Sequence, residues 1–263
     1  MNHLSPPNFK HQTIKPNSTL LVIGGCGGIG FGVVEQALAL GVKVVVMDLA
    51  IAGAQRDISA VSHFIAVDLR DKTSIVAAFA MVESLDITFD SVVISSGYTL
   101  GSEPISTLDI DKFDDVMSGN LRGPVIALQY VSKYLSQHAS IVLLSTAIGQ
   151  IGSVGYAAYG AAKSGLNAIT RILAAELSPA HRVNAIAPGA VDTAFIRGGY
   201  ASGAKESGSA LRFNVEEYNK KIPLGRMANI DDVIGPILFL LSDSARYITG
   251  QVIHVNGGGL MRD

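Results

Sequence analysis

Short runs of apolar, β-branched residues alternate along the chain with longer stretches in which apolar residues recur every three or four positions. The short runs are typical of strands and the longer stretches of helices. Strands are expected at 19–23, 43–47, 63–67, 91–95, 140–144, 182–187 and 251–255. Helices are expected at about 28–40, 71–84, 112–136, 156–178 and 230–242, with a short or irregular one between 48 and 62. This alternation predicts an α/β fold, a single doubly wound domain with a seven-stranded parallel sheet and helices on both faces.

Two segments depart from the regular alternation. Residues 1–18 hold three prolines among polar residues and lack the apolar stretch of a signal peptide, so we expect a flexible N-terminal arm there and one domain over 19–263. The stretch 194–222 is long and is interrupted by glycines. That pattern is typical of a mobile lid over a substrate, and equally of a plain surface insertion.

Composition narrows the possible partners. Of the 263 residues 48% are apolar and 16% are charged, and the net charge of -2 comes without any cluster of Lys or Arg, which argues against nucleic acid. The most apolar region, 19–52, is interrupted by glycines and charges, so we expect no membrane span. The one cysteine excludes an intrachain disulfide, and the six histidines have no ligand spacing, so we predict no metal site. We expect a cytoplasmic protein.

The first predicted strand runs directly into the glycine-rich turn Gly24-Gly25-Cys26-Gly27-Gly28-Ile29-Gly30, and an amphipathic helix follows. Glycines let the backbone turn tightly and approach a pyrophosphate, whose charge is favoured by the N–H groups and the dipole at the start of the helix. Because the turn lies between a strand and a helix, it predicts a Rossmann-type dinucleotide site.

Asp48 ends the second predicted strand, at the edge where open α/β sheets bind ligands. A carboxylate there accepts hydrogen bonds from the adenosine ribose hydroxyls and repels a 2′-phosphate. No Arg or Lys lies in the glycine-rich turn or just after Asp48. We therefore predict NAD as the cofactor in preference to NADP, against the simpler interpretation of Asp48 as a cap of the next turn.

Tyr159 and Lys163 are four residues apart at the start of a strongly helical stretch. That spacing puts both side chains on one face of the helix, with the ammonium beside the phenol. A neighbouring cation favours the phenolate and lowers the pKa of a tyrosine from its usual value of ~10. The pair is a candidate for general acid/base catalysis, although the same spacing arises by chance in many helices.

With these features the sequence resembles the short-chain dehydrogenase/reductase family, from about Thr19 to Gly258. The segment from Ile23 to Gly30 is similar to the family's threonine-glycine-x-x-x-glycine-isoleucine-glycine motif, with Ile23 in place of the threonine. Further matches, in the family's order, are Val67-Asp68-Leu69, Asn120-Leu121-Arg122-Gly123, Asn184-Ala185-Ile186-Ala187-Pro188-Gly189 followed by Val191 and Thr193, and Gly250-Gln251 with Asn256-Gly257-Gly258.

The resemblance implies roles for the matching residues. Asn120, Thr146, Tyr159 and Lys163 would be catalytic, and Thr146, Gln150, Tyr156 and Tyr159 would contact a small-molecule substrate. Asp68 would bind the adenine amino group, and the segment after Asn184 would hold the nicotinamide carboxamide. The NAD-binding residues would be Gly24, Cys26, Gly28, Ile29, Asp48, Leu49, Asp68, Leu69, Ser96, Gly97, Tyr159, Lys163, Pro188, Gly189, Val191 and Thr193. The family's pairing of its long helices implies a homotetramer.

Two departures from the family pattern bear on the site. The family's asparagine-asparagine-alanine-glycine is here Ile94-Ser95-Ser96-Gly97, which puts in doubt the contacts around the nicotinamide ribose. The family's catalytic serine lies thirteen positions before the tyrosine, where this chain has Thr146. Neighbouring side chains near a strand end face opposite ways, so we expect Thr146 to bind the substrate oxygen and Ser145 to be structural, with the reverse assignment left open.

The resemblance implies reversible hydride transfer between a secondary alcohol and its ketone, with Tyr159 moving the proton, Thr146 holding the oxygen and Asn120 fixing a water. The substrate could be a sugar, a hydroxy acid, a cyclic alcohol or an aryl alcohol. Two alternatives stay open. Tyr156 precedes Lys163 by seven residues, the spacing of the related enoyl reductases, and a non-catalytic NAD-binding sensor would keep the fold without the chemistry.

Overall fold

A seven-stranded parallel sheet forms the centre of the molecule in the computed structural model, which describes residues 13–197 and 213–261. The strand order is β3-β2-β1-β4-β5-β6-β7, and neighbouring strands are parallel throughout. The predicted fold is therefore confirmed. The strands are β1 Thr19–Ile23, β2 Lys43–Asp48, β3 His63–Ala66, β4 Phe89–Ile94, β5 Leu135–Leu144, β6 Arg182–Pro188 and β7 Val252–Val255.

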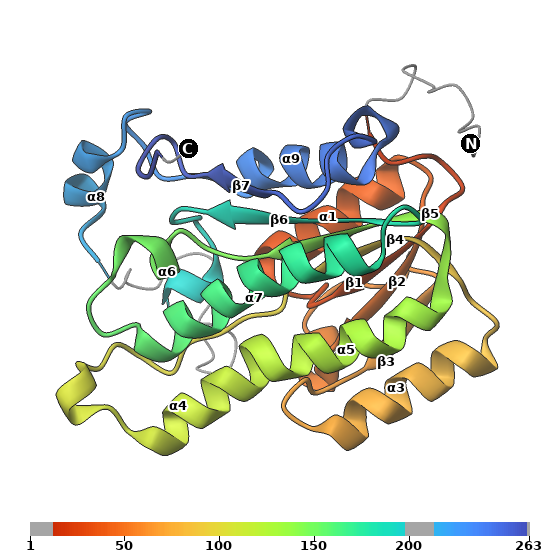
Figure 1. The fold of residues 1–263 in the computed structure, drawn as a ribbon, viewed down its shortest axis with the longest axis horizontal. Coiled ribbons are helices and arrows are strands. Elements are labelled where there is room, and N and C mark those ends of the chain that lie inside the picture. The colour runs from red at the N-terminus through yellow and green to blue at the C-terminus, as the bar shows by residue number, and fades with distance from the viewer. Residues whose placement is uncertain (1–12, 198–212, 262–263) are drawn as a thin grey trace.

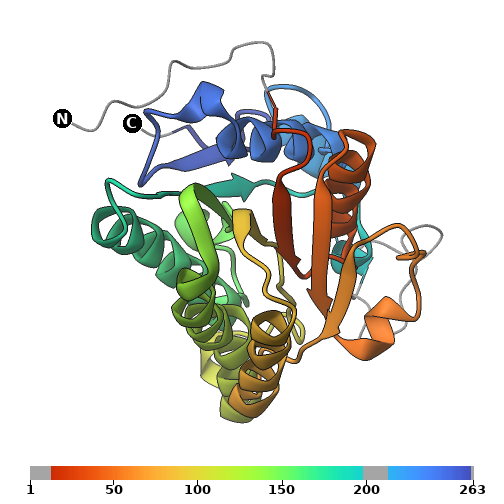
Figure 2. The same ribbon diagram turned by 90° about the vertical axis from the view of Figure 1, so that its right-hand side faces the viewer.

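Helices cover both faces of the sheet (Figures 1 and 2). On one face α1 packs beside α9, and on the other α3 packs beside α5 and α4 beside α7. Two short helices, α2 and α6, follow β2 and β5, and α8 lies near the C-terminal end of the chain. The helices are α1 Gly28–Ala39, α2 Ala50–Gly53, α3 Lys72–Ser84, α4 Ile110–Met117, α5 Gly123–Val131, α6 Ile148–Ile151, α7 Ala157–Glu176, α8 Val215–Lys221 and α9 Asp231–Leu241.

The continuous apolar runs in the sequence are explained by this two-sided cover. In β1, Leu20 and Val22 pack into the core beneath α1 and α9, whereas Leu21 and Ile23 point to the opposite core beneath α3, α5 and α7. All four side chains are buried, because alternate residues of a strand face opposite sides of the sheet. Each contributes roughly 1.5–3 kcal/mol by leaving water.

The prediction of one long helix at 112–136 is wrong in where the helix begins, in where it ends and in its continuity. It starts earlier, at Ile110, because the Asp109 side chain caps it by accepting hydrogen bonds from the N–H groups of Asp111 and Lys112. A π-helical turn, Ser118–Arg122, separates α4 from α5. After Val131 the chain leaves the helix, and β5 begins at Leu135, which pairs with Phe89 of β4.

The structure describes part of each of the two irregular segments. Residues 13–18, which we assigned to a flexible arm, lie against the domain: Ile14 is only 2% exposed in the core beneath α1 and α9, and the Asn17 N–H donates to the Gly41 carbonyl at 2.8 Å. The arm therefore cannot extend beyond residue 12, and 1–12 lie outside the described residues. Of the expected lid, 194–197 form a 3-10 helix and 215–221 form α8, while 198–212 lie outside the described residues.

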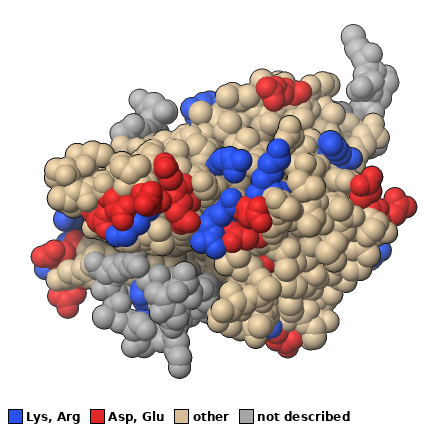
Figure 3. Space-filling model, turned by 90° about the horizontal axis from the view of Figure 1, so that it is seen from below, with Lys and Arg blue, Asp and Glu red and all other residues tan. Residues whose placement is uncertain are grey.

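Charged side chains of both signs lie side by side on the face that carries α3, α4 and α5 (Figure 3). Ion pairs join Lys112 of α4 with Glu103, and Arg70, just before α3, with Asp68. Such a mixed surface lacks the single-sign field of a nucleic-acid-binding face. Within 13–197 and 213–261, every helix is too short or too polar to cross a bilayer.

Candidate active site

The candidate site lies at the carboxyl-terminal edge of the sheet, where β1 and β4 are neighbours. From this pair of strands the chain continues in opposite directions, since β1 leads through α1 to β2 and β4 leads through α4 and α5 to β5. A crevice opens at such a switch point in open α/β sheets, and ligands bind there. The glycine-rich turn after β1 meets the segment Ser95 to Gly97 after β4 at this point.

The glycine-rich turn has no room for side chains at its closest approaches. Gly24 has a φ of 85°, and a Cβ atom there would lie 2.5 Å from the backbone nitrogen of Ser96. A Cβ atom on Gly30 would overlap the Gly24 carbonyl oxygen. The twelve-residue helix α1 begins at Gly28, and Gly27 at its N-cap supplies no capping side chain. Its first N–H groups therefore remain for an anion such as a phosphate.

The two serines that replace the family's asparagine and alanine act differently. The Ser95 hydroxyl donates to the Gly24 carbonyl at 3.0 Å and so braces the glycine-rich turn against β4. The Ser96 hydroxyl is buried and has no hydrogen-bond partner among the described residues. A buried hydroxyl without a partner is costly, and a bound ligand would supply one. The residues at this crevice therefore fit a dinucleotide.

Asp48 ends β2 beside the glycine-rich turn. Its Oδ2 accepts a hydrogen bond from the Cys26 N–H at 2.8 Å and its Oδ1 accepts one from the Leu49 N–H at 2.7 Å. Burial raises the pKa of the Asp48 carboxyl, although both hydrogen bonds oppose the rise. Burial beside this carboxylate also raises the pKa of the Cys26 thiol to about 12, so the thiol is protonated near neutrality.

Arg56 reaches the same turn from farther along the chain. Its Nε donates to the Cys26 carbonyl oxygen at 3.0 Å, and its guanidinium carbon lies 4.6 Å from the centroid of the Phe31 ring. The sequence shows no cation in the turn or just after Asp48, but α2 turns the chain back and brings Arg56 there in space. The lack of a cation near Asp48 in the sequence is therefore weaker support for NAD than we expected.

Tyr159 and Lys163 lie on the first turns of α7, and both are buried. The Lys163 ammonium donates to the carbonyl oxygens of Leu144 at 2.8 Å and Ser96 at 3.0 Å, and lies 5.9 Å from the centroid of the Tyr159 ring. Burial lowers the pKa of Lys163 to about 7 and raises the pKa of Tyr159. The expected lowering of the Tyr159 pKa is wrong, because burial of the phenol and, to a smaller extent, the neighbouring Tyr156 both favour the protonated form.

Asn120 is fully buried on the π-helical turn between α4 and α5. Its Nδ2 donates to the carbonyl oxygens of Val116 at 2.9 Å and Tyr98 at 3.0 Å, and its Oδ1 accepts the Tyr98 N–H at 3.0 Å. A Cβ atom on Gly97 would lie 3.1 Å from Lys163 Nζ and 3.2 Å from Asn120 Oδ1. The structure thus brings Gly97, Asn120 and Lys163 together beside Tyr159. Of these residues Asn120 lies on the π-helical turn, a turn type that often marks functional sites.

The two candidate hydroxyls at the end of β5 are used differently. The Ser145 hydroxyl donates to the Lys163 carbonyl oxygen at 3.2 Å, which ties the strand to α7. The Thr146 hydroxyl oxygen accepts the Ile148 N–H at 3.3 Å, at the start of α6. The assignment of Thr146 to the substrate oxygen and of Ser145 to a structural role stays a prediction. Gln150 lies on α6, and Tyr156 is the residue before α7.

The remaining predicted residues lie along the same sheet edge. Asp68 and Leu69 follow β3, on the far side of β1 from Tyr159. Pro188 ends β6, the Gly189 N–H donates to the Val255 carbonyl at 3.0 Å, and Thr193 is buried. The Phe195 ring closes over Tyr159 with its centroid 5.4 Å away. Among the described residues no group of three or more His, Cys, Asp or Glu side chains could hold a metal ion.

Comparison with known proteins agrees with this geometry. The family model described as enoyl-(acyl carrier protein) reductase matches residues 24–259. A 3-oxoacyl-(acyl-carrier-protein) reductase of Aquifex aeolicus (strain VF5) is 31% identical over 249 residues, covering 90% of this chain and 95% of that protein. The chain belongs to the short-chain dehydrogenase/reductase family.

Other members of the family are similar at lower identity. Galactitol 2-dehydrogenase of Agrobacterium fabrum is 29% identical, with 93% of this chain and 98% of that protein covered. The crystal structure of a short-chain glucose/ribitol dehydrogenase from Brucella melitensis superposes with a TM-score of 0.83 at 26% identity, over 96% of this chain and all of that one. Short-chain dehydrogenases/reductases are oxidoreductases that bind a nicotinamide dinucleotide.

Several residues that shape the site either lie outside the family's motifs or differ from them. Ser95 braces the glycine-rich turn, Arg56 reaches it, and Tyr98 holds Asn120. The Tyr218 hydroxyl of α8 accepts the Ala190 N–H at 2.9 Å, within the segment expected to hold the nicotinamide carboxamide. The only sequence signal for any of them is an unusual residue type beside a motif, as in Tyr98 directly after the Ser95-Ser96-Gly97 segment.

Proposed function

We propose that this chain is an NAD-dependent dehydrogenase that interconverts a secondary alcohol and its ketone, with Tyr159 as the acid/base. The observation that carries the proposal is the position of the Lys163 ammonium, which two carbonyl oxygens hold beside the Tyr159 ring, with Asn120 also next to Gly97. Burying a lysine without a carboxylate partner is costly and is typical of functional sites.

The roles of the side chains follow from their surroundings. Since burial raises the pKa of Tyr159, its hydroxyl stays protonated near neutrality and can donate a proton to a ketone oxygen. In the oxidation direction it must release that proton, which positive charge on Lys163 favours. Thr146 holds the substrate oxygen, and Asn120 orders a water next to Lys163. A bound nicotinamide ring would accept or donate the hydride.

The proposed cofactor preference is NAD, because the Asp48 carboxylate lies at the turn where a 2′-phosphate would have to fit. Gly24, Cys26, Gly28 and Ile29 would receive the pyrophosphate, and Ser96 would give its unpartnered hydroxyl to the cofactor. Arg56 opposes this preference, since a guanidinium near Cys26 would attract a 2′-phosphate. The balance between Asp48 and Arg56 is therefore what an experiment has to measure.

An enoyl reductase is the second candidate, because the matching family model carries that description. It would use Tyr156 in place of Tyr159 to reduce a carbon–carbon double bond. The Lys163 ammonium lies over the ring of Tyr159, the tyrosine that an alcohol dehydrogenase would use, and this position favours the alcohol dehydrogenase. A non-catalytic NAD sensor is the third candidate, and the intact Tyr159, Lys163 and Asn120 argue against it.

The experiment is to mix the purified protein with NAD+ or NADP+ and a panel of polyols, aldoses, hydroxy acids, cyclic and aryl alcohols at mildly alkaline pH, and to follow reduced cofactor. We expect turnover with NAD+ that Tyr159→Phe abolishes and Tyr156→Phe largely keeps. The reverse dependence, with enoyl thioesters as substrates, would establish the enoyl reductase. Tight NADH binding without turnover of the alcohol panel or of enoyl thioesters would favour the sensor, or a substrate outside the compounds tested.

We also propose that the protein is cytoplasmic, forms a homotetramer and acts on a small molecule. Ile172 on α7 is 49% exposed, which suits a helix that pairs with its copy in another subunit. Light scattering of the purified protein would measure the mass, and a monomer would contradict this part of the proposal.

A further inference from the structure

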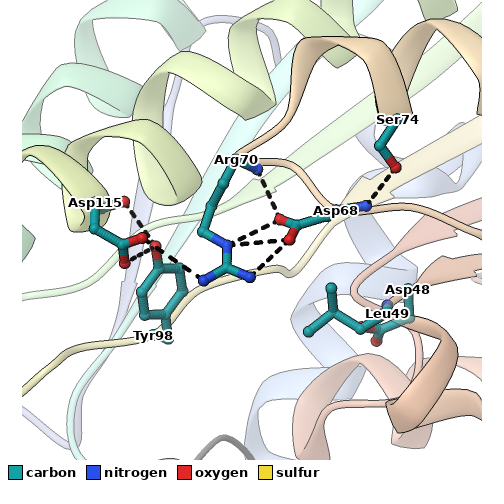
Figure 4. Close-up of polar contacts among 7 residues, drawn as sticks. All are labelled: Asp48, Leu49, Asp68, Arg70, Ser74, Tyr98 and Asp115. Carbon is teal, nitrogen blue, oxygen red and sulfur yellow. Dashed lines mark hydrogen bonds and ion pairs between the residues drawn. The ribbon is translucent and has the colours of Figure 1, made fainter.

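A chain of polar contacts that the proposed mechanism does not use begins at the end of β3 (Figure 4). The Asp68 carboxylate accepts hydrogen bonds from three donors of Arg70: the backbone N–H at 2.9 Å, Nε at 3.0 Å and Nη2 at 2.7 Å. The Arg70 guanidinium also faces Asp115 on α4, with Nη1 3.6 Å from Oδ1. Asp115 Oδ2 in turn accepts the Tyr98 hydroxyl at 2.6 Å.

Tyr98 extends this chain of contacts to Asn120. Its backbone N–H and carbonyl hold the two ends of the Asn120 carboxamide, each at 3.0 Å. Its ring packs closely against the π-helical turn, since a Cβ atom on Gly119 would lie 2.5 Å from the Tyr98 Cε1. The Tyr98 hydroxyl contacts both the carboxylate and the backbone carbonyl of Asp115, and the Tyr98 backbone holds the Asn120 carboxamide. A shift of Asp115 would therefore be passed through Tyr98 to the Asn120 carboxamide beside Lys163.

Arg70 is the link that a ligand can change. Both oxygens of Asp68 already accept hydrogen bonds from Arg70, and this pairing lowers the pKa of the Asp68 carboxyl. A ligand that donates a hydrogen bond to Asp68 must share those acceptor sites, which loosens the hold on Arg70. The guanidinium then pairs more closely with Asp115, to which it now has only a longer contact.

We propose that Arg70, Asp115 and Tyr98 couple binding at the adenosine end of the crevice to the position of Asn120. Arg70 and Tyr98 are then positioning residues, and the ligand group they sense is a hydrogen-bond donor such as the adenine amino group. This inference rests on the proposed function, because it takes Asp68 as the adenosine end of the site and Asn120 as part of the catalytic group.

AMP tests the coupling apart from catalysis, because it carries the adenosine half of the cofactor alone. Calorimetry measures AMP binding, and hydrogen exchange is then followed in the segments around Tyr98 and 116–122 at saturating AMP. In the wild-type protein we expect AMP to slow exchange there by at least about fivefold, the low end of coupling between sites. Arg70→Met should bind AMP without the slowing. Lys72→Met, which removes a nearby exposed positive charge, should keep it.

AMP binding without any change in exchange at 116–122 would overturn the coupling and leave the dinucleotide site standing. An unchanged slowing in Arg70→Met would do the same. If AMP does not bind the wild-type protein, the adenosine site itself is wrong, and the proposed function fails together with the coupling. These outcomes separate the two proposals without any need for a known substrate.

Kinetics provide a second test once a substrate is known. Arg70→Met and Tyr98→Phe should each lower kcat at saturating NAD+ by roughly fivefold. The kcat of the double variant should be little lower than that of the more impaired single variant, since both substitutions break the same chain of contacts. A loss in the double variant equal to the product of the two single losses would mean independent effects. Losses confined to KM would mean that the residues only bind the cofactor. Either result would overturn the positioning role.

Discussion

Replacing Lys163 by methionine should change how stability depends on pH. The side chain is 2% exposed, and burial lowers its pKa from the ordinary value of 10.5 to about 7. Between these pH values the unfolded chain binds one proton more than the folded protein at this group. The free energy of unfolding of the wild-type protein therefore rises with pH across the window from about 7 to 10.5. Below pH 7 the folded protein carries the whole cost of burying the charge.

The structure sets the size of the effect. A pKa lower by 3.5 corresponds to about 5 kcal/mol of cost below pH 7, which the methionine variant avoids. The variant leaves the Ser96 and Leu144 carbonyls without their donor, at about 1–3 kcal/mol each, but this loss does not depend on pH. Relative to the variant, the wild-type protein should therefore gain roughly 2–3 kcal/mol between pH 6 and pH 9.

Urea unfolding of the ligand-free proteins at pH 6 and pH 9, followed by circular dichroism, measures this difference. Tyr159→Phe is the matched control, because burial raises the pKa of Tyr159 and keeps it protonated throughout this range. It should retain the pH dependence of the wild-type protein. Other groups with shifted pKa values, such as Cys26 and His181, are common to all three proteins and cancel. Equal stability differences between Lys163→Met and wild type at both pH values would refute the reasoning.

Three further predictions concern the cofactor turn and the substrate oxygen. Gly24→Ala should lower NADH affinity at least about tenfold by fluorescence titration and destabilise by ~1–3 kcal/mol by urea unfolding, because Gly24 has a positive φ and its Cβ would meet the backbone of Ser96; Gly235→Ala, which has open space, should do neither. In steady-state assays Thr146→Val should lower kcat ~100-fold or more and Ser145→Ala far less, and the reverse order would exchange their roles. Asp48→Ala should lower the ratio of kcat/KM for NAD over NADP and Arg56→Met should raise it, each about tenfold; a ratio unmoved by both would show that neither charge selects the cofactor.

Much of the fold could be predicted because the local spacing of apolar residues indicates where strands and helices lie. A strand such as β1, buried on both faces, produces an apolar run that no surface segment shows. The helix expected at 112–136 fails for a tertiary reason. The residues after Val131 continue an apolar pattern, yet the pairing of Leu135 with Phe89 draws them into the sheet, and no periodicity reports a π-helical turn.

The site shows the same division between local and distant contacts. The glycine-rich turn, Asp48 and the Tyr159–Lys163 spacing are local patterns, and they could be recognised in the sequence. Arg56 at the turn and the contacts from Asp68 to Asn120 join segments far apart in the chain, so no spacing reveals them. The predicted direction of the Tyr159 pKa was wrong because the spacing reveals the neighbouring charge of Lys163 but not the burial of the phenol.

The π-helical turn Ser118–Arg122 has a consequence for how the layer of helices is built. In an α-helix each added residue rotates the next part of the helix by about 100°. A turn with an extra residue therefore rotates the helix after it, so that α4 and α5 present different faces to their neighbours. Here α4 packs against α7, whereas α5 packs against α3. Deleting one residue at this turn would swing the whole of α5 away from its neighbour, so the length of this segment is fixed by two helix contacts at once.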